Sequence, residues 1–310
     1  MLKPRALAPG DRIGIVAPAS PFSRDEFDAG LVELRRLGFD PVHDDSVFER
    51  SRSRYTAGDA TVRAMSFRRA WNDPSIRALV AVRGGYGSVQ LLPYLDREEI
   101  RRAPKAFIGY SDNTSLLTWL NGQCGMVSFH GPMLEGRLSK GSAGYDLDTF
   151  MRVLAHPEPA GAITHPQVET LHRGEATGQL TGGTLTQLAA SLGTPYAFDP
   201  PHGHILFIDE VAERPYRIDR LLMQLRLGGI LERAAGIVFG ELPRCDEPVD
   251  GGPAIRDVLR DVLDDFHGPI LFGLPSGHTS GASLTLPFGV QACVLAGAEP
   301  MLVIEEAAVV

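Results

Sequence analysis

The most constraining feature of this chain is a set of short apolar segments in its first half, separated by segments with helical periodicity. The apolar segments are RIGIVAP (12–18), IRALVAVR (76–83) and KAFIGY (105–110). Residues 23–38 begin with a Ser23–Glu26 capping box and then place apolar residues on one helical face. Strands without polar alternation must be buried on both faces, so helices have to cover both sides of the sheet. The pattern predicts an α/β fold built on a parallel sheet.

The second half of the chain has a different rhythm and predicts a second domain. At 310 residues the chain is long enough for two domains. Around residues 156–177 the periodicity gives way to a Pro-, His- and Gly-containing stretch, which predicts a linker. We therefore expect an N-terminal α/β domain over residues 1–155 and a smaller mixed α/β domain over residues 178–310.

Composition excludes several classes of function. The formal net charge of −8 argues against nucleic acid or an anionic membrane as the main partner. No segment approaches the length of apolar sequence that a membrane-spanning helix needs, and the first apolar segment resembles a strand more than a signal peptide. Three scattered cysteines predict reduced, structural thiols. These features predict a cytoplasmic protein.

Three loops of the first half follow strands and are expected at the edge of the sheet where ligands bind. They are residues 17–20, 83–88 and 110–114. The loop RGGYGS (83–88) is neither G-x-G-x-x-G nor a Walker A motif, so a nucleotide site is not supported. Its glycines allow backbone N–H groups to approach a ligand oxygen closely, which suits an oxyanion hole as well as a phosphate.

A candidate nucleophile follows one of these strands. Ser111 lies between the apolar segment 105–110 and an amphipathic helix, where it and Asp112 could simply cap the helix. A serine nucleophile needs a base and usually an orienting carboxylate. His278 is the candidate base, because it is flanked by small residues in GLPSGHTSG (273–281), where core packing does not explain it.

Two adjacent carboxylates are candidates to orient that base. Asp209 and Glu210 end the apolar run HILFI, and successive side chains of a strand point to opposite faces, so they cannot occupy the same place. The alternative interpretation is that the pair caps the strand end or forms salt bridges with Arg214 or Arg217. At this point the residues leave the choice open.

Other hydrolase signatures are missing. An α/β-hydrolase needs G-x-S-x-G, whereas Gly109-Tyr110-Ser111 is followed by aspartate and asparagine. The chain has no S-x-x-K and no H-E-x-x-H motif. We therefore expect no metal site and no organic cofactor.

Six segments in a fixed order make the chain resemble a known family, the serine LD-carboxypeptidases, which also include the microcin C immunity peptidases. The segments are VRGGYGS, IGYSDNT, HGPM, TGGTLTQLAASLGTPY, ILFIDEVAERPYRIDRLLMQL and GLPSGHT. The resemblance runs from GIVAPAS near the N-terminus to LPFGVQA near the C-terminus. It implies a flavodoxin- or Rossmann-like N-terminal domain, a smaller C-terminal domain, and a Ser-Glu-His triad divided between them.

The resemblance assigns roles to residues of this chain. Ser111 matches the family nucleophile and His278 the family base. The triad glutamate falls in a segment that the family usually writes Leu-Glu-Asp, and here that segment is Ile-Asp-Glu. An ungapped match gives the role to Asp209, with Glu210 as the alternative if the strand end is bulged.

Further roles follow from the chemistry that the resemblance implies. The backbone N–H groups of Asp112 and Gly85 are the expected oxyanion hole. Arg83 is the candidate for holding the terminal carboxylate of a substrate, unless it pairs with an acidic neighbour instead.

The implied substrate is a murein tetrapeptide or its muramoyl form. The bond to be cleaved joins the L-centre of diaminopimelate or lysine to the terminal D-alanine, in cytoplasmic cell-wall recycling. The resemblance also implies a homodimer. Two rival functions stay open: an immunity peptidase that cleaves peptidyl or aminoacyl nucleotides, and a non-catalytic protein that binds muropeptides.

Overall fold

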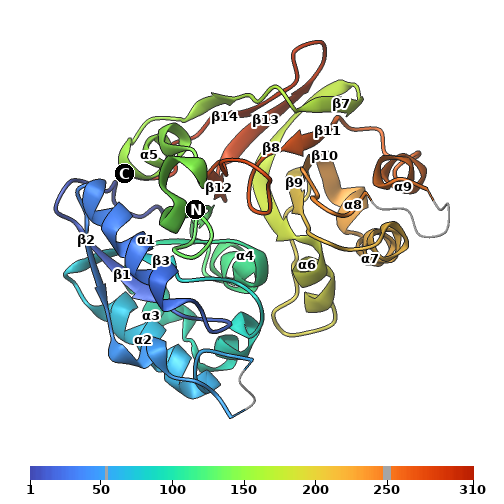
Figure 1. Cartoon of the computed structure of the whole chain (residues 1–310). Coiled ribbons are helices and arrows are strands. Elements are labelled where there is room, and N and C mark those ends of the chain that lie inside the picture. The colour runs from blue at the N-terminus through green and yellow to red at the C-terminus, as the bar shows by residue number, and fades with distance from the viewer. Residues whose placement is uncertain (53–54, 247–252) are drawn as a thin grey trace.

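The computed structural model describes residues 1–52, 55–246 and 253–310 and has an α/β fold built on two sheets (Figure 1). The first sheet contains six strands in the order β12 (Leu286–Phe288), β5 (Ser128–His130), β4 (Ala106–Gly109), β3 (Ile76–Ala81), β1 (Arg12–Val16) and β2 (Asp40–His43). All of these pairs are parallel except β12 with β5. The predicted parallel sheet of the first half is confirmed.

Helices cover this sheet, as its continuously apolar strands require. They are α1 (Arg24–Arg36), α2 (Ala60–Asn72), α3 (Arg97–Arg102), α4 (Thr114–Gly122) and α5 (Leu147–Ala155), with short 3₁₀ segments η1 (Asp45–Phe48), η2 (Ser88–Tyr94), η3 (Ser111–Asn113) and η4 (Leu138–Ala143). Helix α1 begins as the capping box predicts, because Ser23 Oγ accepts a hydrogen bond from the backbone N–H of Glu26 at 3.5 Å. It buries Phe27, Leu31 and Leu34 against the sheet.

The second sheet is mixed and contains eight strands. Their order is β6 (Gly161–Ile163), β14 (Met301–Ile304), β13 (Gln291–Ala296), β8 (Gly174–Thr184), β9 (His204–Asp209), β10 (Ala234–Gly240), β11 (Ile270–Leu274) and β7 (Glu169–His172). The central strands β8 to β11 are parallel, and the outer pairs are antiparallel. The helices described in this part are α6 (Leu185–Ser191), α7 (Pro215–Leu227), α8 (Ile230–Arg233) and α9 (Ile255–Val262).

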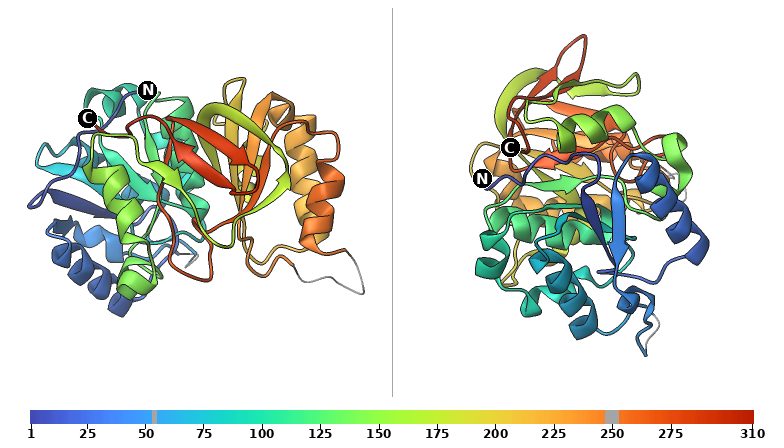
Figure 2. Two further views of the ribbon diagram at one scale, coloured as in Figure 1. Left: turned by 90° about the horizontal axis from the view of Figure 1, so that it is seen from above. Right: turned by 90° about the vertical axis from the view of Figure 1, so that its left-hand side faces the viewer.

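The two sheets share one apolar core. Phe207 of β9 and Val238 of β10 belong to the same buried cluster as Phe129 of β5 and Phe288 of β12. A second cluster fills the opposite face of the second sheet, beneath α6, α7 and α9. In Figure 1, α7 and α9 lie on the side away from the first sheet, as the view from above in Figure 2 also shows, whereas α6 lies beside α4. A large apolar interface of this kind holds the two sheets in a fixed relative orientation, whereas a small polar interface would allow the two parts to move relative to each other.

The structure differs from the expected domain division in two places. Residues 156–177, expected as a linker, contribute β6, β7 and the first residues of β8 to the second sheet. Strand β12 (286–288), expected in the second domain, pairs with β5 of the first sheet. The reason for both differences is backbone pairing. The short strands β6, β7 and β12 lie at the edges of the two sheets, where they satisfy the backbone hydrogen bonds of the neighbouring strand. The chain therefore crosses between the two parts more than once.

The chain ends lie close together in Figure 1, and they are tied by hydrogen bonds from Ala6 N to Val310 O (2.8 Å) and from Val310 N to Pro4 O (3.0 Å). Among the described residues, no helix is both long and apolar enough to cross a membrane.

Candidate active site

The candidate site lies where the carboxyl ends of parallel strands from both sheets meet. Strand β4 ends at Gly109, two residues before Ser111, and β9 ends at Asp209. The loop after β11 carries His278. Direct bonds join the two edges, because Thr184 N at the end of β8 donates to Thr114 Oγ1 at the start of α4 at 3.0 Å. Such an edge is where ligands bind in parallel α/β sheets.

Ser111 has a strained backbone. Its φ of 62° lies in the left-handed region, which non-glycine residues rarely occupy outside functional sites. The preceding strand ends at Gly109 and the helix α4 begins at Thr114, so the serine sits on a sharp strand-to-helix turn. A Cβ on Gly84 would come within 2.7 Å of Ser111 Cβ and 2.9 Å of its Oγ. Only glycine therefore fits opposite the hydroxyl.

The glycine loop is fastened to the loop after β1. Ser20 N donates to Gly84 O at 3.2 Å, and Tyr86 N donates to Ser20 Oγ at 3.0 Å. Gly85 has a φ of 101°, and a Cβ there would collide with Ser20. Two of the three loops predicted at this edge therefore pack directly on each other, and Gly84 of the glycine loop lies against Ser111.

The Asp112 side chain is fully used inside the protein. One carboxylate oxygen accepts from Ser88 N at 2.7 Å and the other from Gln187 Nε2 at 3.2 Å. Asp112 is 2% exposed. Its side chain thus fixes the turn after Ser111 and ties it to α6, which leaves the backbone N–H as the part of Asp112 that could serve a ligand.

Asp209 holds His278 in one orientation. His278 Nδ1 lies 2.7 Å from Asp209 Oδ2, and the His278 backbone N–H donates to the same carboxylate at 3.2–3.3 Å. Asp209 is completely buried. Burial lowers the pKa of His278, but the charge and the hydrogen bond of Asp209 outweigh burial, so its pKa lies above the usual 6.5. The bond to Nδ1 leaves Nε2 as the nitrogen that can accept a proton.

Glu210 points to a different place. Its Oε2 accepts from Thr186 Oγ1 (2.6 Å) and Thr186 N (2.9 Å), so it fixes the start of α6. Burial raises the pKa of Glu210. The two adjacent carboxylates therefore take separate positions, as strand alternation requires, and it is Asp209 that contacts His278.

Tyr110 connects the serine turn to His278 by a ring contact. The ring of Tyr110, the residue before the serine, lies edge-on to the His278 ring with centroids 5.1 Å apart. Within the described residues, no hydrogen bond joins Ser111 Oγ to His278. In ligand-free enzymes, catalytic hydrogen bonds are often long and shorten when substrate binds.

A second buried histidine lies behind the carboxylate. His130, at the end of β5, is inaccessible to solvent, and its Nδ1 lies 3.0 Å from Ser276 Oγ. Its Nε2 is 4.0 Å from Asp209 Oδ2 and has no hydrogen-bond partner among the described residues. Burial lowers the pKa of His130 to about 4, so the ring is neutral near pH 7. The sequence pattern gave His130 no role, although it is the first residue of the segment HGPM.

Arg83 pairs with an acidic neighbour. Its Nε lies 3.2 Å from Glu135 Oε2, and its Nη1 donates to Pro21 O at 3.0 Å. The side chain is 41% exposed. Among the described residues Nη2 has no hydrogen-bond partner, so this pairing still leaves a donor of a partly exposed side chain available.

Two further residues that sequence reasoning missed hold the loop that carries His278. Glu241, directly after β10, accepts from Thr279 Oγ1 and from Ser280 N at 2.9 Å. Arg137 donates to carbonyl groups of the same loop. The only available signal was their position in the sequence. Glu241 directly follows an apolar segment, and Arg137 lies four residues after the segment HGPM.

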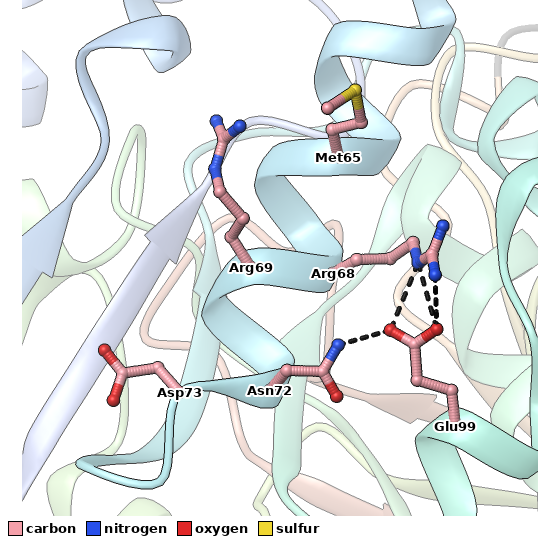
Figure 3. A pocket seen from close by; sticks show the side chains of 6 residues that line it. All are labelled: Met65, Arg68, Arg69, Asn72, Asp73 and Glu99. Carbon is pink, nitrogen blue, oxygen red and sulfur yellow. Dashed lines mark hydrogen bonds and ion pairs between the residues drawn. The ribbon is translucent and has the colours of Figure 1, made fainter.

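A hollow on the outer face of α2 is separate from this site. It measures about 460 Å³ and is lined by Met65, Arg68, Arg69, Asn72, Asp73 and Glu99 (Figure 3). Arg68 and Asn72 both bond to Glu99 there, so these three polar groups already satisfy one another. Within residues 1–52, 55–246 and 253–310, no cluster of His, Cys, Asp and Glu could hold a metal ion.

Comparisons with known proteins agree with the resemblance. Residues 13–131 match the LD-carboxypeptidase N-terminal domain, and residues 177–294 match the LD-carboxypeptidase C-terminal domain. A Bacillus subtilis protein named "Probable murein peptide carboxypeptidase" is 34% identical over 94% of this chain and 91% of its own length. The murein tetrapeptide carboxypeptidase of Pseudomonas aeruginosa is 32% identical over 91% of this chain and 92% of its own length.

Solved structures extend the likeness. The microcin C7 self-immunity protein MccF in its ligand-free state superposes with a TM-score of 0.90 at 25% identity, over 99% of both chains. The two matched domains span most of the chain, and each contains part of the site: Ser111 lies in the first, and Asp209 and His278 lie in the second. The chain belongs to the LD-carboxypeptidase family of serine peptidases, peptidase S66.

Proposed function

We propose that this protein is a serine LD-carboxypeptidase that removes the terminal D-alanine from murein tetrapeptides. The bond cleaved joins the L-centre of diaminopimelate or lysine to D-alanine. The observation that carries the proposal is the 2.7 Å contact between His278 Nδ1 and Asp209 Oδ2, at the strand ends that also present the strained Ser111. Relatives named for murein peptides supply the substrate class.

The chemistry begins with attack by Ser111. As substrate enters, its hydroxyl comes within hydrogen-bond distance of His278 Nε2, which takes the proton while Oγ bonds to the peptide carbonyl carbon. His278 then gives that proton to the leaving amine of D-alanine, and an acyl-enzyme ester remains. Water attacks the ester with His278 again as base, which releases the shortened peptide and restores the serine.

Fixed dipoles stabilise the charge that develops on the substrate oxygen. The proposed oxyanion donors are the backbone N–H groups of Asp112 and Gly85, which the Ser88, Gln187 and Ser20 contacts hold in place. Arg83 is the proposed partner of the terminal carboxylate, through the guanidinium nitrogen that Glu135 and Pro21 leave free.

The test is D-alanine release from murein tetrapeptide, measured by mass spectrometry with wild type and Ser111→Ala. The wild type should release D-alanine, and Ser111→Ala should lower release to background. A tetrapeptide that ends in L-alanine is the matched control and should stay intact. Release that survives Ser111→Ala would contradict the nucleophile. A wild type that binds the tetrapeptide without cleaving it would favour the muropeptide-binding alternative.

A second candidate activity is cleavage of an aminoacyl or peptidyl nucleotide, and one observation favours it. Tyr86, in the glycine loop beside Ser20, is 52% exposed and offers an aromatic face on which a base could stack. An aminoacyl sulfamoyl adenosine offered to the same enzyme separates the two candidates. Hydrolysis of that compound without D-alanine release would select the second.

The proposal also places the protein in cell-wall recycling in the cytoplasm, as a homodimer. Fractionation of cells that express a tagged chain tests the location. Sedimentation equilibrium of the purified protein tests the dimer, and a single species at the monomer mass of 33.5 kDa would contradict it.

A further inference from the structure

Arg137 is an unusual buried cation at the boundary between the two parts of the site. It lies at the start of η4 and is 9% exposed. Among the described residues, no carboxylate lies within ion-pair distance of its guanidinium. Burying a charge without a partner is costly, so the guanidinium must be stabilised by other groups.

Those groups are neutral oxygens from both sides of the site. Nη2 donates to Gly277 O (2.7 Å) and Thr279 O (2.9 Å), and Nη1 donates to Gly281 O (2.9 Å) and Gly144 O (3.4 Å). Nε donates to Tyr110 Oη at 3.3 Å. An arginine carries five N–H donors, and these contacts use all of them. Arg137 therefore has no donor left for a substrate.

The acceptors belong to the two segments that carry the reacting groups. Gly277, Thr279 and Gly281 surround His278, and Tyr110 directly precedes Ser111. The Tyr110 ring also contacts the His278 ring edge-on at 5.1 Å. We propose that Arg137 is a positioning residue that fixes the 277–281 loop against Tyr110 and so sets the distance between His278 and Ser111. This inference rests on the proposed function of those two residues.

The guanidinium shape matters as well as its charge. A lysine at this position would keep the charge but would offer three donors from one point, so it could not bond to carbonyls spread around a planar fork. The charge has its own effect, because it opposes protonation of His278. The titratable or charged groups around His278 are Asp209 and Glu210 at the end of β9, Tyr110 after β4, His130 at the end of β5, Glu241 after β10, and Arg137 itself.

The experiment compares Arg137→Met and Arg137→Lys with wild type. Arg233→Met is the matched control, because Arg233 also donates to loop carbonyls, Gly229 O (3.0 Å) and Pro200 O (3.1 Å), but lies outside the site. Arg137→Met should lower kcat about 100-fold, the loss that a misplacement near 1 Å produces, with KM within about threefold of wild type. Arg137→Lys should recover only part of that loss. Arg233→Met should keep wild-type kcat.

A second readout does not depend on the substrate. The titration of His278 is followed by NMR, and Arg137→Met should move its midpoint to higher pH because an opposing positive charge is gone, whereas Arg137→Lys should leave it near the wild-type value. This measurement separates failure of the inference from failure of the proposed function. If the wild type releases no D-alanine, the His278 titration still decides whether Arg137 acts on the base.

Three results would overturn the inference. The first is a folded Arg137→Met protein whose kcat is within twofold of the Arg233→Met control. The second is a rise in KM at unchanged kcat, which would assign Arg137 to substrate binding. The third is an unmoved His278 titration in Arg137→Met. If that variant does not fold, Tyr110→Phe removes only the Tyr110 Oη contact, and it should still lower kcat several-fold with KM unchanged. Wild-type kcat in Tyr110→Phe would also contradict the inference.

Discussion

The nucleophile side and the base side of the site are held by two different kinds of structure. On the nucleophile side, backbone geometry does most of the positioning. Ser111 has a φ of 62°, and Gly84 and Gly85 leave no room for a Cβ next to Ser111 and Ser20. Adding a methyl group to either glycine should displace Ser111 or the glycine loop, because the backbone cannot rotate away from a clash as a side chain can.

On the base side, polar side chains do the positioning. His278 is bonded to Asp209, and its loop is held by Arg137 from one side and by Glu241 from the other. On this side, substitutions that remove a charge or a hydrogen bond should have the largest effect on activity. Substitutions that change only the volume of an exposed side chain should have little effect on activity. The comparison predicts two classes of variant that differ in their pH dependence as well as in their rates.

The largest effect on the base side should come from Asp209→Asn. We expect kcat/KM to fall by about 10³- to 10⁴-fold, because an amide can no longer hold His278 in the required tautomer or stabilise the imidazolium. Glu210→Gln should cost less than about tenfold in kcat/KM. It should instead lower the free energy of unfolding by about 1–3 kcal/mol, because the amide weakens the bonds to Thr186.

D-alanine release and urea unfolding of both variants measure this contrast. A larger loss of activity in Glu210→Gln than in Asp209→Asn would transfer the orienting role to Glu210. It would also mean that the loop rearranges when substrate binds, because Glu210 contacts Thr186 and not His278 in the structure.

The largest steric effect on the nucleophile side should come from Gly84→Ala. The added methyl group would meet Ser111 Cβ at 2.7 Å and Oγ at 2.9 Å, so kcat should fall about 100-fold as the hydroxyl is displaced. Gly122→Ala is the matched control, because a Cβ there meets nothing within 4 Å in helix α4. It should keep activity and add about 0.5–1 kcal/mol of stability.

Steady-state kinetics and thermal unfolding of the two alanine variants measure this contrast. Wild-type kcat in Gly84→Ala would show that the glycine loop can shift to accommodate the methyl group. It would contradict the prediction that the nucleophile side is sensitive to small changes in volume.

The sequence predicted the nucleophile side more completely than the rest of the fold. Continuous apolar strands and helical periodicity are local signals, so the parallel sheet and the serine at its edge could be read from neighbouring residues. Strand alternation predicted only that Asp209 and Glu210 take different positions, and the choice of Asp209 came from the ungapped match to the family segment. In the structure the two side chains do take different positions, and Asp209 is the one that contacts His278.

The base side depends on contacts between distant residues, which local patterns do not encode. Arg137 reaches carbonyls about 140 residues away along the chain, and no spacing rule links it to His278. The same limit explains the strands in residues 156–177 and the pairing of β12 with β5, because short strands become visible only when their partners are known. The sequence offered Arg83 either as a substrate-binding residue or as the partner of an acidic neighbour. Its actual partner, Glu135, is distant in the sequence and could not be identified from it.

A smaller effect on the base side should come from Glu241→Gln. The Glu241 carboxylate accepts hydrogen bonds from Thr279 Oγ1, Ser280 N and Ser280 Oγ. A glutamine amide has only one acceptor oxygen, so the loop should lose about one hydrogen bond to a charged group. We expect kcat to fall about tenfold with KM nearly unchanged. Unchanged kcat in this variant would show that Arg137 alone is sufficient to hold the loop.

The smallest effects should be displacements of the pH profile, and they distinguish the two sides most directly. His278 must be neutral to accept a proton, and its pKa lies above 6.5, so kcat/KM of the wild type should fall as pH drops through a midpoint above 6.5. Asp209→Asn removes the charge that raises the pKa, so the acid limb of its residual activity should move to lower pH. Gly84→Ala should lower the rate at every pH and leave the limb in place, because the added methyl group carries no charge. A limb that moves in Gly84→Ala, or stays fixed in Asp209→Asn, would show that the two sides are not independent and that one displacement repositions both Ser111 and His278.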